Sequence, residues 1–356
     1  MKNFSQTIQE ARKSRQLKMK EVAAMTGIDQ ALISKFEHGR RLPTEAQVSV
    51  LIQCYELGEE DLRPLWLAER LYEIIRDDPH ALRALAVAES RIEYLRGEEA
   101  LQMQKVPDQL KQQLVRIDEL KTSWLAHKPL NATQLRKMRE YFNIEYTFES
   151  NRIEGNTLSL QETQLVVNEG LTIGGKSMQE HLEAINHSEA VQFLEELADS
   201  HATINRRILL DLHALILKSI DKENAGKYRA VPVRISGSKH EPPQPYLLDK
   251  LMEDYFRYYQ QYRYQLHPVV LAAEMHERLV SIHPFIDGNG RTSRLIMNLI
   301  LLQHGYTIAN LKGDAPSRLA YYQALESVQI NNEPQPFYQL VANAVEESLN
   351  DHLALV

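Results

Sequence analysis

What this sequence lacks excludes several classes of protein. Among its 356 residues there is one cysteine, Cys54, so an internal disulfide framework is impossible and a reducing compartment, the cytoplasm, is expected. Cys54 lies in the apolar run VSVLIQCY, which indicates a buried structural thiol rather than a nucleophile. No apolar run approaches the ~18 residues of a membrane-spanning helix, and the start of the chain is too polar for a signal peptide. We therefore expect no membrane partner.

The residues that are present indicate a globular, mainly helical protein. Apolar residues make up 43% of the chain and charged residues 25%, and runs of Leu, Ala, Glu, Gln and Arg favour helices. A chain of this length predicts two or three domains. Met1–Pro43 holds nine Lys and Arg against four Asp and Glu, a local charge of +5, although the whole chain has a net charge of −7. This basic segment predicts an electrostatic contact of its own.

The first segment has the pattern of a helix-turn-helix. In MKEVAAMTGIDQALISKFEHGRRLPT, a small residue at Ala23 lets two helices approach, Gly27 makes the turn, and Ile33 fills the joint. Asp29 or Gln30 opens the helix that follows the turn. The helices predicted for this segment are Phe4–Arg15, Met19–Thr26, Asp29–Glu37 and Glu45–Tyr55.

This stretch resembles the lambda-repressor/Cro-like (XRE-type) DNA-binding family, whose E-x-G-x-x-x-P ending is matched by Glu37, Gly39 and Pro43. The resemblance implies that the helix after the turn faces the major groove of DNA and that a homodimer binds the operator. The residues that it places at the DNA are Gln30, Ser34, Lys35, Arg40 and Arg41. A helical protein-docking module with a solvated basic face is the alternative.

The rest of the chain predicts a connector and a second helical domain. We assign residues 1–64 to the helix-turn-helix domain, 65–124 to a helical connector that could supply a dimer surface, and 125–356 to the second domain. The stretch GKYRAVPVRISGSKHEPPQP interrupts the helical pattern, and its alternation of apolar residues before Gly237 predicts a short β-hairpin. The expected fold class is mainly α, with that hairpin as the exception.

Residues 283–294, HPFIDGNGRTSR, concentrate groups that suit a phosphate site. Pro284 ends one helix, and a tight loop leads directly into the next, so that loop amides and a helix N-terminus form an anion nest. Asp287 beside such a nest would repel phosphate unless a divalent cation such as Mg²⁺ bridged them. His283 is the nearby group suited to remove a proton at neutral pH.

The glycines and arginines of the same motif extend this prediction. Gly288 and Gly290 allow close backbone approach, and Asn289 adds a side-chain donor. Arg291 and Arg294 oppose the helix dipole at its N-terminus unless an anion lies there, which predicts a polyphosphate ligand. Taken singly, a structural histidine, a common glycine turn and a solvated arginine pair are the ordinary interpretations. Their combination predicts a base, a metal carboxylate, a phosphate nest and two phosphate clamps.

HPFIDGNGRTSR matches the Fic (filamentation induced by cAMP) signature H-x-F-x-[DE]-G-N-G-R-x-x-R at every defined position. The resemblance covers roughly residues 125–345. It implies an all-helical domain that transfers AMP from Mg·ATP to a hydroxyl of a target protein or of itself, releasing pyrophosphate. His283 would deprotonate the hydroxyl and Asp287 would hold Mg²⁺. Gly288, Asn289 and Gly290 would cradle the α- and β-phosphates, with Arg291 on the β- and Arg294 on the γ-phosphate.

Two further places carry the same resemblance. The hairpin resembles the flap of the family, which aligns a target segment by β-strand addition, and a surface hairpin without a ligand is the alternative. In YYQAL, Tyr322 corresponds to a tyrosine near the adenine, with Gln329 close by, although aromatic residues at this spacing are otherwise core. The residues assigned to the flap are Val231, Val233, Ile235, Gly237 and His240.

A second motif, SNRIEG, matches the inhibitory pattern [ST]-x-x-x-E-[GN] of the family through Ser150, Glu154 and Gly155. The first two lie four apart on a helix predicted near residues 147–156, which Gly155 would end. The resemblance implies that Glu154 forms a bidentate ion pair with Arg294, fills the γ-phosphate clamp and silences the enzyme. In some members the same glutamate orients water to remove AMP.

The function predicted from these patterns is that of an autoinhibited protein adenylyltransferase with a DNA-binding module. The alternative is a transcriptional regulator whose Fic domain senses a nucleotide or modifies the protein itself. A toxin-like growth inhibitor restrained in cis is a third interpretation.

Overall fold

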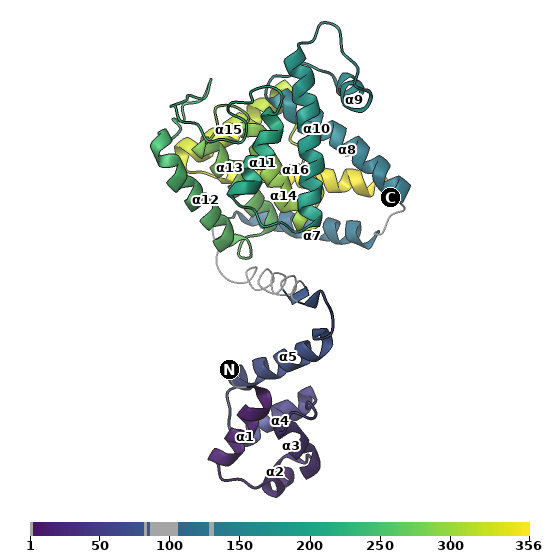
Figure 1. The fold of residues 1–356 in the computed structure, drawn as a ribbon, viewed down its shortest axis with the longest axis vertical. Coiled ribbons are helices and arrows are strands. Elements are labelled where there is room, and N and C mark those ends of the chain that lie inside the picture. The colour runs from purple at the N-terminus through teal and green to yellow at the C-terminus, as the bar shows by residue number, and fades with distance from the viewer. Residues whose placement is uncertain (1–2, 82–83, 86–105, 128–131) are drawn as a thin grey trace. The chain divides into compact units, whose positions relative to one another are not determined.

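The computed structural model describes residues 3–81, 84–85, 106–127 and 132–356, and it divides into two compact units, Met1–Glu89 and Ser90–Val356 (Figure 1). Every regular element in these described ranges is a helix, which confirms the mainly-α class. None of the described helices is both long enough and apolar enough to cross a membrane.

The smaller unit contains the predicted helix-turn-helix. Its helices are α1 (Phe4–Ser14), α2 (Met19–Thr26), α3 (Gln30–Glu37), α4 (Glu45–Tyr55) and α5 (Glu59–Ile75). Gly27 ends α2 with φ 69°, and Asp29 caps α3 by accepting a hydrogen bond from the Ala31 amide at 2.8 Å. The turn chemistry expected from the sequence is therefore present.

One apolar core holds this unit together, and it includes α5. Ile33 and Phe36 from α3 are buried in it together with Trp66 from α5, whose Nε1 donates to the Pro43 carbonyl at 2.9 Å. The predicted connector, residues 65–124, therefore begins inside this core and ends inside the other unit, and residues 82–83 and 86–105 of it lie outside the described ranges. Cys54 is a buried free thiol in the same core, as expected.

The larger unit is a bundle whose centre is the pair α13 and α14 (Figure 1). Nearly every side chain of α14 is buried, because α8, α10, α11 and α13 all pack against it. The loop at residues 283–288 joins the two central helices and is thereby held rigidly on both sides. The helices of this unit are α7 (Asp108–Ala126), α8 (Ala132–Ile153), α9 (Leu160–Glu169), α10 (Met178–Asp199), α11 (Arg206–Leu217), the 3₁₀ turn η2 (Pro245–Leu247), α12 (Leu248–Tyr262), α13 (Pro268–Ile282), α14 (Asn289–Gln303), α15 (Ala315–Asn331) and α16 (Gln335–Leu353).

The β-hairpin predicted at residues 231–240 is not formed, which corrects that expectation. This segment is irregular, with a turn at residues 236–237 in which the Ser238 amide donates to the Ile235 carbonyl at 3.2 Å. Pro232, Pro242 and Pro243 cannot donate ladder hydrogen bonds, and an isolated two-stranded hairpin is only marginally stable. We call residues 231–243 the flap segment below.

Candidate active site

The loop between α13 and α14 is fixed by its own side chains. Asn289 accepts from the Phe285 amide at 3.0 Å and donates to the Phe285 carbonyl at 2.9 Å. Phe285 itself is fully buried. The oxygen and one N–H of the Asn289 side-chain amide are thus used within the loop, and its second N–H and its main-chain amide are the donors that remain for an anion.

His283 begins this loop in a left-handed conformation. Its φ is 51°, and its amide still donates to the Leu279 carbonyl at 2.9 Å. Nδ1 lies 3.2 Å from the Val280 carbonyl, so Nδ1 carries the proton and Nε2 is the free acceptor. Burial lowers the pKa of His283 to about 4, although its contact with the Val280 carbonyl opposes this. The ring is therefore neutral and able to take a proton at pH 7.

His213, on α11, supports the same loop, and the motif gave no signal for it. Its ring stacks on Phe285 with centroids 3.6 Å apart. The Gly226 amide donates to Nδ1 at 2.9 Å, so Nε2 carries the proton and donates to the Asp287 carbonyl at 2.9 Å. Burial lowers the pKa of His213 to about 4 and keeps this neutral tautomer. A Cβ on Gly288, whose φ is 77°, would meet the same ring at 3.4 Å.

Arg291 lies on the first turn of α14 and is buried. Nη1 lies 3.5 Å from Glu183 and Nη2 3.4 Å from Asp287, which are ion-pair distances but longer than a good hydrogen bond. Nε and Nη1 have no hydrogen-bond partner in the described part of the chain. An arginine with unsatisfied donors beside a helix N-terminus has the chemistry of an anion-binding residue.

Arg294 is fully buried and holds the segment that contains SNRIEG. Its Nε donates to the Ser150 hydroxyl at 3.0 Å, and its Nη2 donates to the Ser150 carbonyl at 2.8 Å. Nη2 also donates to Glu154 Oε1 at 2.6 Å. The ion pair with Glu154 is thus present through one hydrogen bond, and the expected bidentate geometry is wrong because Ser150 occupies the Nε edge.

The carboxylate of Glu154 lies where a ligand of the α14 N-terminus would approach. It follows α8 directly, and Gly155, with φ 99°, allows the turn. A Cβ added to Gly290 would collide with Glu154 Oε1. Burial opposes ionisation of Glu154, but the charges of Arg294 and Arg291 outweigh it and lower the pKa of this carboxyl. Glu154 is therefore an anion in the position expected for a phosphate.

Tyr321 and His276 extend the contacts of Arg294, and sequence reasoning missed both. The Tyr321 hydroxyl lies 3.5 Å from Arg294 Nη1 and 3.2 Å from His276 Nε2. Burial, reinforced by the charge of Arg294, holds the pKa of His276 well below its usual value. The neutral imidazole can thus accept from Tyr321, which in turn accepts from Arg294, so the guanidinium is oriented from α13 and α15 as well.

The Asp287 side chain fits a metal bound mainly by substrate. It is 55% exposed, Oδ1 accepts from the Gly288 amide at 2.6 Å, and Oδ2 lies near Arg291. The described residues contain no group of three or more His, Cys, Asp or Glu side chains that could hold a metal ion by themselves. One exposed carboxylate beside a phosphate nest matches Mg²⁺ sites in which water and nucleotide oxygens supply the other ligands.

Two side chains of α15 flank the site from opposite ends. The Tyr322 hydroxyl donates to the Ile153 carbonyl at 3.0 Å, just before Glu154. Gln329, two helical turns further, donates to the Ser281 hydroxyl at 3.0 Å, two residues before His283. The two residues are seven apart in sequence and therefore lie on one face of α15.

The flap segment is fastened to the loop by Arg229, a residue that sequence reasoning did not assign. Arg229 Nη1 donates to the Val231 carbonyl at 2.9 Å and Nη2 to the Pro243 carbonyl at 2.5 Å, while Nε donates to the His283 carbonyl at 2.8 Å. His240 also reaches α13, with Nε2 2.8 Å from the Ser281 carbonyl. Gly237 has φ 78°, and Val233 and Ile235 are half-buried between these anchors.

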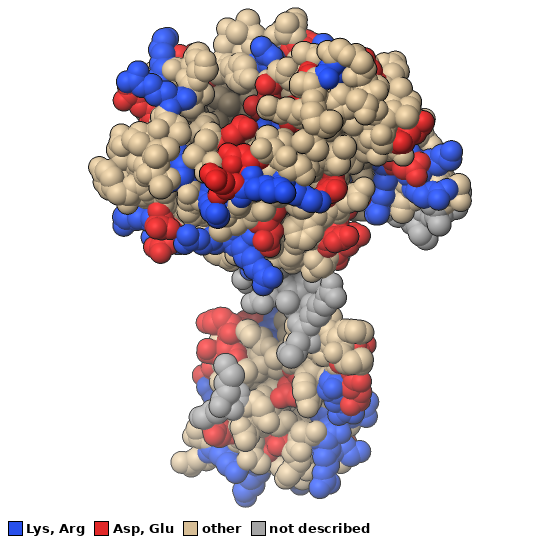
Figure 2. Space-filling view, turned by 45° about the horizontal axis from the view of Figure 1, so that its top comes forward, with Lys and Arg blue, Asp and Glu red and all other residues tan. Residues whose placement is uncertain are grey.

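A separate candidate site lies on the smaller unit. Gln30 opens α3 and is exposed, Ser34 is half-buried one turn later, and Lys35, Arg40 and Arg41 are exposed. Figure 2 shows Lys and Arg side chains gathered along the lower end and right flank of this unit. The buried Glu37 fixes α3 through two hydrogen bonds from Arg12, at 2.6 and 2.9 Å. The helix that carries the exposed residues is therefore rigidly held.

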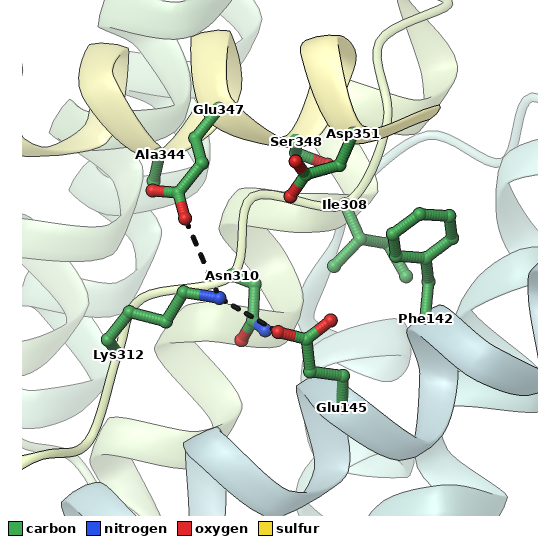
Figure 3. Close-up of a pocket in the computed structure, with 9 residues that line it drawn as sticks. All are labelled: Phe142, Glu145, Ile308, Asn310, Lys312, Ala344, Glu347, Ser348 and Asp351. Atoms are coloured by element: carbon green, nitrogen blue, oxygen red, sulfur yellow. Dashed lines mark hydrogen bonds and ion pairs between the residues drawn. The ribbon is translucent and has the colours of Figure 1, made fainter. Parts of the chain in front are cut away.

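The cavity in Figure 3 lies apart from the motif loop. It lies between α8, residues 308–312 and α16, and Lys312 crosses it to reach Glu145 at 2.9 Å and Glu347 at 3.8 Å. Its volume is about 20 Å³, which suits a water molecule and excludes a nucleotide.

Comparison with known proteins adds to this geometry. The profile of the family described as Fic/DOC matches residues 203–301, and that of a helix-turn-helix family matches residues 8–62. A protein named protein adenylyltransferase Fic from Drosophila virilis is 30% identical over 341 residues, which are 95% of this chain and 66% of that protein. The chain spans between 63% and 65% of the length of similar relatives from other Drosophila species, so it covers less than two thirds of each of them.

Solved structures show the same likeness. A Fic domain containing signaling protein from Bacteroides thetaiotaomicron is 26% identical with a TM-score of 0.61, over 67% of this chain and 97% of that one. A fragment of Fic-1 from C. elegans is 25% identical with a TM-score of 0.62, over 98% of each chain.

Proposed function

This chain carries a Fic/DOC-family domain behind a helix-turn-helix domain, and we propose that it is an autoinhibited protein adenylyltransferase whose smaller unit binds DNA. The observation that carries the proposal is the Glu154–Arg294 ion pair inside a phosphate site with unsatisfied donors. The buried cysteine is consistent with a cytoplasmic protein.

The proposed reaction is an in-line displacement at the α-phosphorus of ATP. A Ser, Thr or Tyr hydroxyl of the target gives its proton to His283 Nε2 while its oxygen bonds to the α-phosphorus. The bond from that phosphorus to the bridging oxygen breaks, and pyrophosphate leaves. Nδ1–H of His283 faces the Val280 carbonyl, which leaves Nε2 as the acceptor.

The N-terminus of α14 would receive the phosphates. The main-chain amides of Asn289 and Gly290 point along a favourable helix dipole, and Arg291 has buried donors without hydrogen-bond partners in the described chain. Arg291 would take the β-phosphate and Arg294 the γ-phosphate. Asp287 would hold Mg²⁺, which supplies charge neutralisation when bound.

Glu154 would inhibit because it competes for the same clamp. Its carboxylate binds Arg294 and lies against Gly290, so a γ-phosphate on Arg294 requires that Glu154 leave. The same carboxylate, near His283, is also suited to orient water for AMP removal.

The intact mass of Glu154→Gly after incubation with ATP and Mg²⁺ tests the chemistry. We expect a gain of one AMP on Glu154→Gly and no gain on Glu154→Gly/His283→Ala. An equal adduct on both variants would exclude His283 as the base. The proposal fails if Glu154→Gly gains no AMP and also labels no protein in a lysate supplied with α-labelled ATP.

The exposed basic face of the smaller unit carries the second part of the proposal. Gel shifts with the DNA upstream of the protein's own gene, with and without Mg·ATP, test it. Sequence-selective binding that changes after self-modification would support a regulator that is switched by its own AMP transfer. Binding that is salt-dependent but indifferent to sequence would count against it.

A further inference from the structure

Arg229 is a buried cation without an ion-pair partner among the described residues. Only 3% of it is exposed, and its guanidinium meets main-chain oxygens of Val231, Pro243 and His283. Its amide also donates to the Pro284 carbonyl, at 2.9 Å. Burial lowers the pKa of Arg229, as expected for a cation that faces dipoles only.

Such a residue is a poor choice for stability alone. Burying a charge without a counter-ion is unfavourable, and carbonyl dipoles offset the loss of hydration only in part. A planar guanidinium holds its donors on three separate nitrogens in a rigid fork, whereas the three donors of a lysine all lie on one nitrogen and cannot span oxygens that are as far apart. At Arg229, Nη1 and Nη2 meet the two ends of the flap segment and Nε meets the motif loop, so the guanidinium joins these two segments.

The joined segments are the flap and the beginning of the motif loop. Val231 and Pro243 are the two ends of the flap segment, whereas His283 and Pro284 open the loop. His283 has φ 51°, a strained conformation for a residue with a side chain. Two hydrogen bonds from Arg229, one to each of these carbonyls, fix the main chain that follows the histidine.

Resting on the proposed function, we propose that Arg229 is the positioning residue that holds the flap and the catalytic base in one fixed relation. A target segment docked on residues 231–243 would then present its hydroxyl to Nε2 of His283. Arg229 touches neither substrate nor ATP in this role, because it acts through the main chain of both segments.

The charge of Arg229 has a second effect at the same place. Burial is the largest influence that lowers the pKa of His283, and the Arg229 guanidinium lowers it further. Among the described residues, Glu154 raises this pKa and His240 lowers it. Removal of the guanidinium charge therefore raises the pKa of His283.

Two substitutions separate position from charge. In the full-length Glu154→Gly protein, Arg229→Lys keeps the charge but cannot reach three oxygens, and Arg229→Gln loses both. We expect both to lower AMP transfer by about 100-fold, the usual effect of a displacement of about 1 Å, with the affinity for Mg·ATP unchanged. Arg207→Gln, at a side chain that is 90% exposed, is the matched charge control.

Titration of the His283 ring by NMR, assigned with His283→Ala, is the second readout and needs no turnover. We expect a higher midpoint in Arg229→Gln only, with Arg229→Lys and Arg207→Gln like the parent. Transfer at the parental rate in Arg229→Lys would overturn the proposal, and so would a loss of ATP affinity in proportion to activity. Absence of transfer in the Glu154→Gly parent would instead defeat the proposed function, and the NMR midpoint would then test only the effect of the Arg229 charge on the pKa of His283.

Discussion

The protonation of His283 is set by its burial. A ring with an ordinary pKa near 6.5 would be partly charged at neutral pH, whereas the pKa of this ring is lowered to about 4. The base form is therefore fully available across the physiological range, and its donor Nδ1 is already directed at Val280.

The burial of His283 predicts that the rate of AMP transfer falls only at an unusually low pH. The kcat/KM of Glu154→Gly, which reports the free enzyme, should remain at ~90% of its neutral value at pH 5 and fall through about pH 4. The negative charge of Glu154 raises the pKa of His283, so its loss in Glu154→Gly does not shift the fall in kcat/KM to higher pH. Circular dichroism at each pH controls for unfolding, and a half-loss near pH 6.5 would contradict the account.

Ser150 carries a prediction about stability. Ser150→Ala removes the acceptor of Arg294 Nε and leaves a fully buried donor unsatisfied. The free energy of unfolding should fall by about 1–3 kcal/mol in urea titrations. Ser123→Ala, on an exposed position of α7, should change it by less than about 0.5 kcal/mol. Equal effects of the two substitutions would show that the Ser150–Arg294 hydrogen bond does not contribute to the free energy of unfolding.

The sequence predicted those site residues whose chemistry is concentrated in a short motif. His283, Asp287 and the two arginines of the motif were predicted from residue type and spacing, because the motif loop leads directly into the N-terminus of α14. Arg229 and His213 act on the same loop from positions far away in the chain. Arg229 ends the stretch GKYR, which carries part of the family resemblance but gave no role for this residue, and His213 lies in no motif. Their partners are main-chain carbonyls and amides, which leave no trace in residue identity.

At the scale of elements, the loop between α13 and α14 depends on Gly288. Gly288 has a left-handed φ of 77°, so Gly288→Ala should lower the free energy of unfolding by about 1–2 kcal/mol through backbone strain. The loss should be larger still, because the added Cβ would lie 3.3 Å from Ile216 and 3.4 Å from His213. Gly175→Ala has the matched strain, with φ 82°, in open space. Thermal denaturation of both variants should show the larger loss at Gly288, and equal losses would contradict the packing of His213 on the loop.

Helices were predictable in the smaller unit because caps and turn residues are local. Gly27 and Asp29 define the helix-turn-helix junction from the sequence alone. The flap was mispredicted as a hairpin, because its alternation of apolar residues is the same whether they pair with a strand or pack between Arg229 and His240. Only the tertiary anchors distinguish these outcomes.

At the scale of the whole molecule, two units with separate apolar cores carry the two parts of the proposed function. Among the described residues, the apolar core of the smaller unit contains no residue of the larger one. The placement of Lys35 and Arg41 on an exposed face suits phosphate contacts, whereas Gln30 at the start of α3 suits a base.

These roles predict different responses to mutation in the full chain. Arg41→Gln should weaken binding to all DNA sequences and reduce the slope of log affinity against log salt by about 1. Gln30→Ala should instead weaken binding to the preferred sequence only. Anisotropy titrations at several salt concentrations check both, and an identical loss on every sequence for Gln30→Ala would remove it from base recognition.

The measurement that tests the central claim most directly is the rate of AMP transfer by the wild type, Glu154→Gln and Glu154→Gly under the same Mg·ATP conditions. A charged hydrogen bond contributes about 1.5–3 kcal/mol, and 1.4 kcal/mol is about tenfold, so Glu154→Gly should be faster by roughly 10- to 100-fold. Glu154→Gln, which keeps the shape and loses the charge, should lie between the other two. Equal and weak transfer by all three proteins would contradict the claim that Glu154 silences the enzyme by occupying Arg294.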